Sequence, residues 1–388
     1  MYQRKASGFQ QRLYPPGPSP YLECLLPDAG DFVRSKVFVS LIRDDIKAFR
    51  PNGPDMNDDP FMRRAIILAF RAFSLESPVK MIHLIDMFKK DLPIWSSSPG
   101  LPWNLQGYKT KGDIRKNPDA IQRVRLFWHQ VKNRDPVSND DCCAFVRAQI
   151  VQVGETKARC VWGYPATMMF GEAVFALPLI EAYMKCNSPI AYGFETGNAG
   201  MRKLIDQCKG RYFLGIHFKS FDKTVPEWII RVAFYILLLQ IDFLYFQDYG
   251  VARGDAMLRM WDHLIDYFIN TPIRMSNGER YIKKGGIASG SYFAHIVGSI
   301  VNYIFLNYAL LKLGVKVDYI KVFGDDSLCG LQKSIAVEDI AEVLEPLGMS
   351  INVAKSGVSS RLSDLTFLGY KISEGFPTKS GDKVDALP

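Results

Sequence analysis

The chain has 388 residues, and its 48% hydrophobic content argues against extensive disorder and for two or three subdomains with a sizeable buried core. A formal net charge of +8, from 48 basic and 40 acidic residues, favours a polyanionic partner, although a nonspecific cationic surface explains this excess nearly as well. The seven cysteines show no Cys-x-x-Cys spacing, and the amino terminus is polar and lacks the apolar core of an export signal. Both observations argue against a secreted disulfide-bonded protein and predict reduced thiols in the cytosol.

Helices are predicted for most of the first half of the chain. Residues 14–20 and 51–55 are rich in proline, glycine and aspartate and predict an extended arm. Apolar residues recur at helical spacing from Pro60 to Leu92, and the helical pattern continues through residues 115–150 before strands begin. Basic residues gather between 109 and 134, where they form either a phosphate-binding face or an ordinary solvated helix face.

A strand, a long apolar stretch and a small-residue loop follow. Residues 212–226 show an apolar strand pattern that ends at Asp222. The stretch from Ile229 to Phe246 contains an arginine, a glutamine and an aspartate, so we interpret it as a buried helix rather than a membrane span. Asn277-Gly278 predicts a β-hairpin, and the glycine- and serine-rich loop at 285–293 leads into another helix.

Residues 319–330 hold the most informative feature of the sequence, two adjacent acids between two strand-like runs. Branched and aromatic residues alternate before Gly324, which permits a turn, and a second apolar run follows. Two negative charges side by side repel and raise each other's pKa unless a cation neutralises them. An ordinary surface turn is the alternative, but Asp325 and Asp326 at a hairpin tip predict a divalent-metal site.

Three motifs follow one another in the order found in the palm of template-dependent polymerases. They are Phe221–Pro226, Ser289–Phe293 and Gly324–Leu328. In this combination the chain resembles the viral RNA-dependent RNA polymerases, most closely those of the partitivirus and picobirnavirus group of double-stranded RNA viruses, from about residue 90 to residue 375. The resemblance implies an α+β right-hand polymerase fold, in which helices flank an antiparallel palm sheet and the fingers subdomain is mostly helical.

The resemblance also implies a division of the chain. We expect an N-terminal extended arm or fingertip segment at residues 1–60, fingers at 61–205, a palm at 206–375 with a fingers insertion at about 240–284, and a tail at 376–388. Only 18 residues follow the predicted strand that ends at Tyr370, too few for a helical thumb. We therefore expect the thumb to be truncated or supplied by another chain.

The chemistry implied is RNA-templated RNA synthesis by nucleotidyl transfer, for replication or transcription of a double-stranded RNA virus genome. Two Mg²⁺ or Mn²⁺ ions, about 3.5–4 Å apart, would neutralise charge on the attacking and leaving oxygens. Asp325 is expected as the principal bridging ligand and Asp326 as an auxiliary one. Asp222, Ser289 and Asn302 are expected to sense the ribose 2′-hydroxyl, because a deoxy substrate would leave such groups unpaired.

Further matches imply contacts with nucleotide and template. Lys157 and Arg159 resemble the basic fingers motif that holds the incoming triphosphate through charge-assisted hydrogen bonds. Lys355 resembles a mobile lysine that donates a proton to the departing pyrophosphate, with an ordinary solvated lysine as the alternative. The loop at 96–103 resembles one that guides the template, although a proline-rich surface turn explains it equally well. The predicted template contacts are Ser98, Pro99, Gly100 and Gly290.

One position departs from the family pattern. These polymerases carry a metal-binding acid five residues before the aspartate that matches Asp222, and this chain has His217 there. Neutral imidazole suits softer metals and brings no negative charge to a magnesium pair, so we expect catalysis to be weakened. A non-catalytic RNA-binding relic is therefore the alternative function. A reverse transcriptase fits less well, because that group usually has no glycine directly before its acidic pair.

The resemblance also implies the partners of the chain. They are an RNA template and product, nucleoside triphosphates and, as a candidate, a viral coat protein, with no membrane. The location implied is the cytoplasm, or the virion if the sequence comes from an intact virus.

Overall fold

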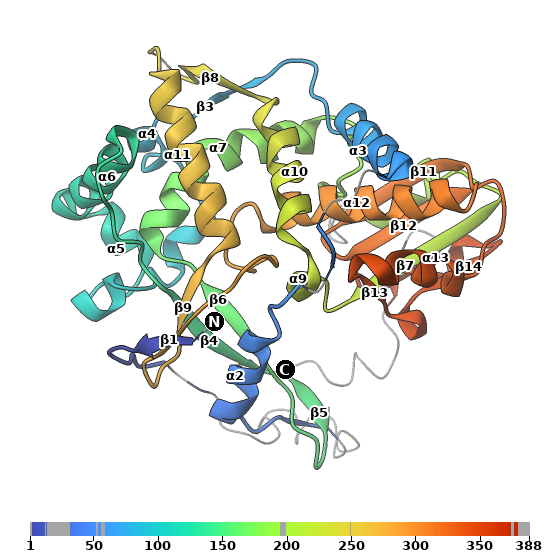
Figure 1. Cartoon of the computed structure of the whole chain (residues 1–388), viewed down its shortest axis with the longest axis horizontal. Helices are drawn as coiled ribbons and strands as arrows, with labels where there is room; N and C mark the ends of the chain where they lie inside the picture. The colour runs from blue at the N-terminus through green and yellow to red at the C-terminus, as the bar shows by residue number, and fades with distance from the viewer. Residues whose placement is uncertain are drawn as a thin grey trace.

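The computed structural model describes residues 2–11, 13, 32–51, 53–55, 59–194, 199–248, 250–373 and 376–378 (Figure 1). The proline-rich stretch at 14–20 and residues 379–388 of the expected tail lie outside the described residues. Helices and β-sheets are mixed along the described chain, and most of the buried apolar side chains form one continuous core. The expected division into fingers and palm stays a prediction.

A five-stranded antiparallel sheet carries the acidic hairpin. Its strands are β7 (Tyr212–Lys219), β11 (Val317–Phe323), β12 (Asp326–Leu331), β13 (Ser350–Ile351) and β14 (Gly357–Ser359). β12 lies between β11 and β7, and both β13 and β14 pair with the other edge of β7. Leu214, Ile216 and Phe218 alternate along β7 and are at most 2% exposed. This alternation specifies the register in which Asp326 pairs with His217.

Helix α12 (Ala294–Lys312) lies against this sheet, between the strands and other helices (Figure 1). Its neighbours are β11, α3 (Pro60–Ala72), α10 (Glu227–Leu238) and α13 (Val337–Leu344). Every residue from Ile296 to Leu310 is buried, because the helix is apolar on nearly all sides. The polar side chains that α12 does carry therefore need partners inside the protein.

Two helices, α7 (Ala166–Lys185) and α12, are long and apolar enough to span a membrane by length and composition alone. Their most apolar windows are 67% and 89% buried inside the protein. Such burial is that of a core helix packed against other protein elements.

The apolar stretch from Ile229 to Phe246, predicted as one buried helix, is instead α10 followed by the strand β8 (Ile241–Phe246). The break comes at Gln240, whose buried side chain accepts a hydrogen bond from the Leu75 amide at 2.8 Å. Strand β8 then pairs in parallel with β3 (Val79–Met81). The prediction was wrong here because the hydrogen bonds that end the helix come from residues far away in the sequence.

A second five-stranded sheet has the order β1-β10-β9-β4-β6. Its strands are β1 (Tyr2–Lys5), β4 (Cys142–Ala148), β6 (Ala158–Gly163), β9 (Pro272–Arg274) and β10 (Glu279–Ile282). The predicted hairpin at Asn277-Gly278 is confirmed, since β9 pairs with β10 across it and Gly278 has a φ of 87°. Helix α2 (Val39–Lys47) packs on β6.

The helical prediction for residues 115–150 is correct only for its first part. Helix α6 (Pro118–Asn133) ends where Arg134 adopts a left-handed φ of 66°, and β4 begins at Cys142.

Further helices are α4 (Leu84–Met87), α5 (Lys111–Arg115), α8 (Gly200–Gln207), α9 (Phe221–Thr224) and α11 (Gly254–Ile269). Two smaller sheets pair β2 (Phe32–Arg34) with β5 (Ile150–Gln152), and β15 (Thr366–Phe367) with β16 (Tyr370–Ser373) and β17 (Phe376–Thr378).

Candidate functional site

The acidic turn, Gly324–Asp325, joins β11 to β12, and side chains of α12 form hydrogen bonds with its backbone. Gly324 has a φ of 59°, and its amide donates to Ser299 Oγ at 3.0 Å. The Asn302 side-chain amide donates to the carbonyls of Gly324 and Asp326, at 2.9 and 3.2 Å. Both α12 side chains are fully buried, so they support the turn without contact with solvent.

His217, at the end of β7, contacts both acids of the turn. Its Nδ1 lies 2.7 Å from Asp326 Oδ1, and its Nε2 lies 3.5 Å from Asp325 Oδ2. The hydrogen bond to Asp326 raises the pKa of His217. Burial raises the pKa of Asp325, and the negative charge of Asp326 raises it further. The two acids thus have a basic partner from the neighbouring strand.

A central pocket of about 420 Å³ opens in front of the turn. Residues from distant segments line it, and they include His217, Asp222, Ser289, His295, Asp325 and Arg159. Asp222 follows β7 in the short helix α9, and its carbonyl accepts a hydrogen bond from the Ile287 amide. The expected proximity of Asp222 to Asp325 is therefore present in the structure.

The charges around Asp222 are of both signs. Burial raises the pKa of its carboxyl group, and the positive charge of Lys223 opposes this shift. Asp45 and Asp325 raise the pKa further, whereas Arg159 lowers it. Carboxylates, the Arg159 guanidinium and the Lys223 ammonium therefore line the same pocket.

Arg159 reaches the pocket because α2 holds its strand in place. Asp45, on α2, accepts the backbone amide of Cys160 at 2.9 Å and forms an ion pair with Lys223. Asp45 itself lines the pocket, although the sequence contains no motif that marks it. Lys157, the other predicted triphosphate ligand, is exposed just before β6 and is not among the residues that line the pocket.

The glycine–serine loop, Ser289–Phe293, is held by a buried carboxyl group that the sequence interpretation missed. Glu172 on α7 accepts the Ser291 hydroxyl at 2.7 Å and the Tyr292 amide at 2.8 Å. Burial raises the pKa of Glu172 to about 8. The sequence signal for this role is that Glu172 is an acid within a long apolar run, since a buried carboxyl group needs a hydrogen-bond partner inside the protein.

Comparison with known proteins decides the family. A family model described as viral RNA-dependent RNA polymerase matches residues 31–385. The chain belongs to this family. It is 28% identical over 305 residues to the RNA-directed RNA polymerase of Cryptosporidium parvum virus 1 (strain KSU-1), across 75% of this chain and 55% of that protein. It is 26% identical over 286 residues to the RNA-directed RNA polymerase of Atkinsonella hypoxylon virus (isolate 2H), across 62% of this chain and 43% of that protein.

The resemblance drawn from the three motifs is thus confirmed. The chain spans about half the length of these two viral polymerases, so the activity of the whole proteins is a proposal for this chain.

In this member of the polymerase family, half of the residues in the loop predicted to guide the template (96–103) are buried. Pro99 accepts the Ala166 amide through its carbonyl at 2.8 Å, and a Cβ on Gly100 would lie 2.8 Å from the Tyr164 carbonyl oxygen. Ser98 is exposed, whereas Pro99 and Gly100 are buried. Pro99 and Gly100 therefore pack inside the protein, and the template contacts expected of this loop stay a prediction.

Gly290 also has a packing role. A Cβ at this position would lie 1.9 Å from the Trp162 carbonyl oxygen on β6, so only glycine permits this close approach. Ser289, next to it, lines the central pocket, and its contact with the ribose stays a prediction.

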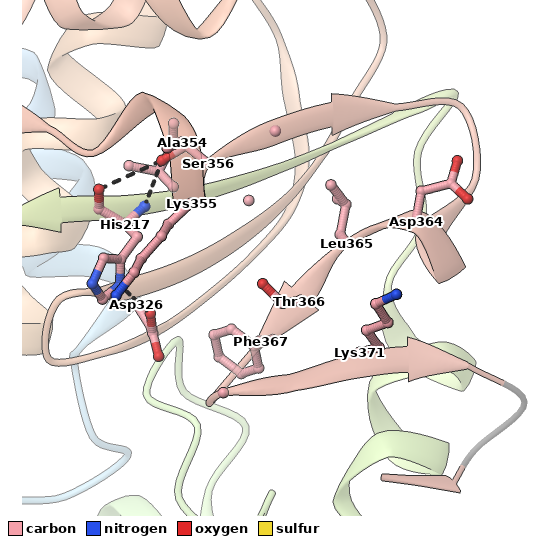
Figure 2. Close-up of a pocket in the computed structure, with 14 residues that line it drawn as sticks. His217, Asp326, Ala354, Lys355, Ser356, Asp364, Leu365, Thr366, Phe367 and Lys371 are labelled. Carbon is pink, nitrogen blue, oxygen red and sulfur yellow. Dashed lines mark hydrogen bonds and ion pairs between the residues drawn. The ribbon is translucent and has the colours of Figure 1, made fainter. Parts of the chain in front are cut away.

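Lys355 lies in a second pocket of about 400 Å³, on the other side of His217 (Figure 2). Figure 2 shows its side chain extending past His217 toward Asp326, while Asp364 and Lys371 lie at the far end. His217 lines both pockets. Lys355 is therefore separated from Asp222 by the His217–Asp326 pair.

Asn302 is the predicted ribose contact that the structure places elsewhere. Its amide points to the turn carbonyls, and it does not line the central pocket. The α12 residues that face the pocket are Ala294, His295 and Gly298, one turn or more before it. The resemblance implied a residue of this helix, and α12 does line the pocket, but the Asn302 side chain turns to the carbonyls of the turn.

The polymerase family uses divalent metal ions, and His217, Asp325 and Asp326 form one possible site among the described residues. Their donor atoms all lie within 4.8 Å of one another. One imidazole and two carboxylates fit a single divalent cation. They do not fit the expected pair of Mg²⁺ ions, because β7 offers an imidazole where such a pair needs a further oxygen ligand.

Proposed function

We propose that this chain carries out RNA-templated RNA synthesis for a double-stranded RNA virus. The observation that supports this most strongly is the central pocket, where Asp325, Asp222, Ser289 and Arg159 meet from four separate segments. The family membership and the names of both relatives agree with it. The two-ion mechanism implied by the resemblance is not part of this proposal, since the donor set does not fit it.

The residues that line the pocket have tasks that their chemistry allows. The Arg159 guanidinium binds phosphate oxygens of the incoming nucleotide through paired charge-assisted hydrogen bonds. Asp222 and Ser289 accept and donate hydrogen bonds at the ribose hydroxyl, so a deoxynucleotide leaves them unpaired. Asn302 and Ser299 hold the turn so that Asp325 faces this nucleotide.

The two predicted lysines lie outside this set. Lys157 does not line the central pocket, so the proposal assigns the triphosphate to Arg159 alone. Lys355 meets pyrophosphate or RNA from the second pocket.

The partners in this proposal are nucleoside triphosphates, an RNA template and the RNA product. Exposed Ser98 and the basic residues between 109 and 134, apart from buried Lys111, are the proposed template contacts. A coat protein and a cytoplasmic or virion location remain proposals that follow from the viral family alone.

A second candidate function is RNA binding without catalysis. The observation in its favour is that His217 already pairs with both acids of the turn, so a basic side chain occupies the position where metal-binding charge is expected. A basic partner lowers the net negative charge available to a divalent cation.

Primer extension with labelled nucleotides and Mg²⁺ or Mn²⁺ distinguishes the two functions. Incorporation should fall by about 100-fold or more in Asp325→Ala. Asp318→Ala is the matched control, because Asp318 lies at the opposite end of the same strand pair. RNA binding without incorporation under either metal supports the non-catalytic function, and equal incorporation by Asp325→Ala refutes the proposed site.

A further inference from the structure

Lys283, which directly follows β10, is a fully buried lysine whose partners are backbone carbonyl groups. Its Nζ donates hydrogen bonds to the carbonyl oxygens of Phe268, Ile269, Gly285 and Gly286. The contacts to the last three are 3.2, 3.3 and 2.9 Å long. An ammonium group carries three donors and no acceptor, so this set of carbonyls suits the charged form of the side chain.

Keeping this ammonium group inside the protein is costly. Burial lowers the pKa of Lys283 to about 7, and no carboxylate among the described residues opposes this shift. An apolar side chain would fill the same space without the loss of hydration. What the lysine adds is a set of directed hydrogen bonds, so its role lies in the backbone that these bonds hold.

The four carbonyls belong to two segments that Lys283 holds together. Phe268 and Ile269 end helix α11, where the last carbonyls have no partner within the helix and favour a cation. Gly285 and Gly286 begin the glycine–serine segment, and their φ angles of 76° and 71° are left-handed. The Gly285 amide also donates to the Ile269 carbonyl at 3.1 Å. The end of α11 and the glycine pair are thus joined around one buried cation.

The glycine pair in turn contacts the backbone of Asp222. The Gly286 amide donates to the Val225 carbonyl at 2.8 Å, and the Ile287 amide donates to the Asp222 carbonyl at 2.6 Å. A Cβ on Gly286 would lie 2.8 Å from the same Asp222 oxygen, so the two backbones are in close contact. Ser289 follows two residues after Ile287, and both Ser289 and Asp222 line the central pocket. A small shift of this segment therefore moves both side chains.

We propose that Lys283 is a positioning residue for ribose recognition. Its ammonium group fixes residues 285–287, and these residues determine where Asp222 and Ser289 meet the ribose hydroxyl. Lys283 is not among the residues that line the central pocket, so it acts through the segment rather than on the nucleotide. The inference rests on the proposed function, because the ribose contacts are those proposed above. Hydrogen bonding depends steeply on geometry, so loss of the ammonium group affects the choice between ribose and deoxyribose more than phosphate binding by Arg159.

The test compares Lys283→Met with Lys321→Met in primer extension by the full chain, with ATP or 2′-deoxyATP opposite a template uridine. Lys321 is a matched control, since it is also buried, donates to the Ser188 carbonyl at 2.5 Å and does not line the central pocket. Lys283→Met should lower the preference for ATP, as the ratio of the two kcat/KM values, by about tenfold or more. Lys321→Met should keep the wild-type ratio. An unchanged ratio in Lys283→Met would overturn the proposal.

Amide hydrogen exchange gives a second readout that needs no catalysis. Exchange at the Ile287 amide should become about tenfold faster or more in Lys283→Met. It should stay unchanged at Tyr292, whose acceptor is Glu172, and at both amides in Lys321→Met. Slow exchange at Ile287 in Lys283→Met would show that the segment is held without the lysine, and the positioning role would be wrong.

The two readouts separate this inference from the proposed function. Faster exchange at Ile287 in a chain that incorporates no nucleotide supports the positioning role and refutes the polymerase activity. Incorporation with an unchanged preference for ATP in Lys283→Met does the reverse.

Thermal melting verifies that each variant is folded. Lys283→Gln keeps two N–H donors without a charge, and it should show both effects at a smaller size. It replaces Lys283→Met if that variant does not fold. Failure of both to fold, beside a folded Lys321→Met, would make Lys283 a structural residue and overturn its role in ribose recognition.

Discussion

The two loops that face the central pocket are held in different ways. The acidic turn is held by neutral groups of α12, the Asn302 amide and the Ser299 hydroxyl. The glycine–serine loop is held by Glu172, a buried carboxyl group whose pKa is raised to about 8 by burial. The hydrogen bonds from α12 to the turn are therefore independent of pH in the neutral range. The hydrogen bonds to the loop depend on pH there, because the Glu172 carboxyl group titrates.

The largest effect is expected when the support of the turn is removed. Asn302→Ala leaves two turn carbonyls without their donor inside the protein, so the free energy of unfolding should fall by about 3 kcal/mol. Asn307→Ala is the matched control on the same helix, because among the described residues its amide donates to the Tyr303 carbonyl one turn earlier and to no other group, and it should cost about 1 kcal/mol. Urea denaturation measures both, and equal costs would contradict the role assigned to Asn302.

The packing of the glycine–serine loop against β6 gives the next largest effect. In Gly290→Ala the new Cβ would lie 1.9 Å from the Trp162 carbonyl oxygen, and the backbone must move at a cost of about 2–3 kcal/mol. Gly298→Ala, whose Cβ would lie 3.4 Å from Gly324 Cα, should be close to neutral. The same denaturation measurement applies, and a stable Gly290→Ala protein would show that the loop has room to adjust.

The titration of Glu172 should produce a pH dependence that the support of the turn lacks. In the folded protein the group keeps its proton up to about pH 8, whereas the unfolded chain loses it near the ordinary pKa of 4.5. Stability from this group is therefore present at low pH and is lost as pH rises through that window. Relative to Glu172→Gln, the wild type should lose on the order of 3 kcal/mol between pH 5 and pH 8.

Denaturation midpoints at about pH 5, 6, 7 and 8, which lie between the two pKa values, measure this difference. A constant difference between wild type and Glu172→Gln across the series would show that Glu172 does not titrate there. Asn302→Ala serves as the comparison, since its difference from wild type should not vary with pH.

The smallest expected effect concerns Ser299. Ser299→Ala removes one hydrogen bond from the turn, and the free energy of unfolding should fall by about 1 kcal/mol. Amide hydrogen exchange should become faster at Gly324 and stay unchanged at Tyr292, whose acceptor is Glu172. Faster exchange at both amides would mean that the two loops are not supported separately.

Local patterns predicted the parts of the fold that depend on neighbouring residues. Alternation along residues 212–219 and the glycine before two acids predicted β7 and the acidic hairpin, because strand period and turn chemistry act over a few residues. The same reasoning failed at Gln240, where the helix ends through a hydrogen bond to the Leu75 amide. Local patterns also do not show that Pro99 and Gly100 are buried, because their burial depends on the segment near Tyr164.

By itself the sequence determined the family, the acidic hairpin and the presence of His217 in place of an acid. The tertiary structure alone decided that Asp45 enters the pocket, that Glu172 holds the glycine–serine loop and that Asn302 supports the turn. The physical reason is that a buried polar side chain turns toward whichever unpaired group lies within reach. Those groups come from segments more than a hundred residues away for Asp45 and Glu172, and no local pattern encodes them.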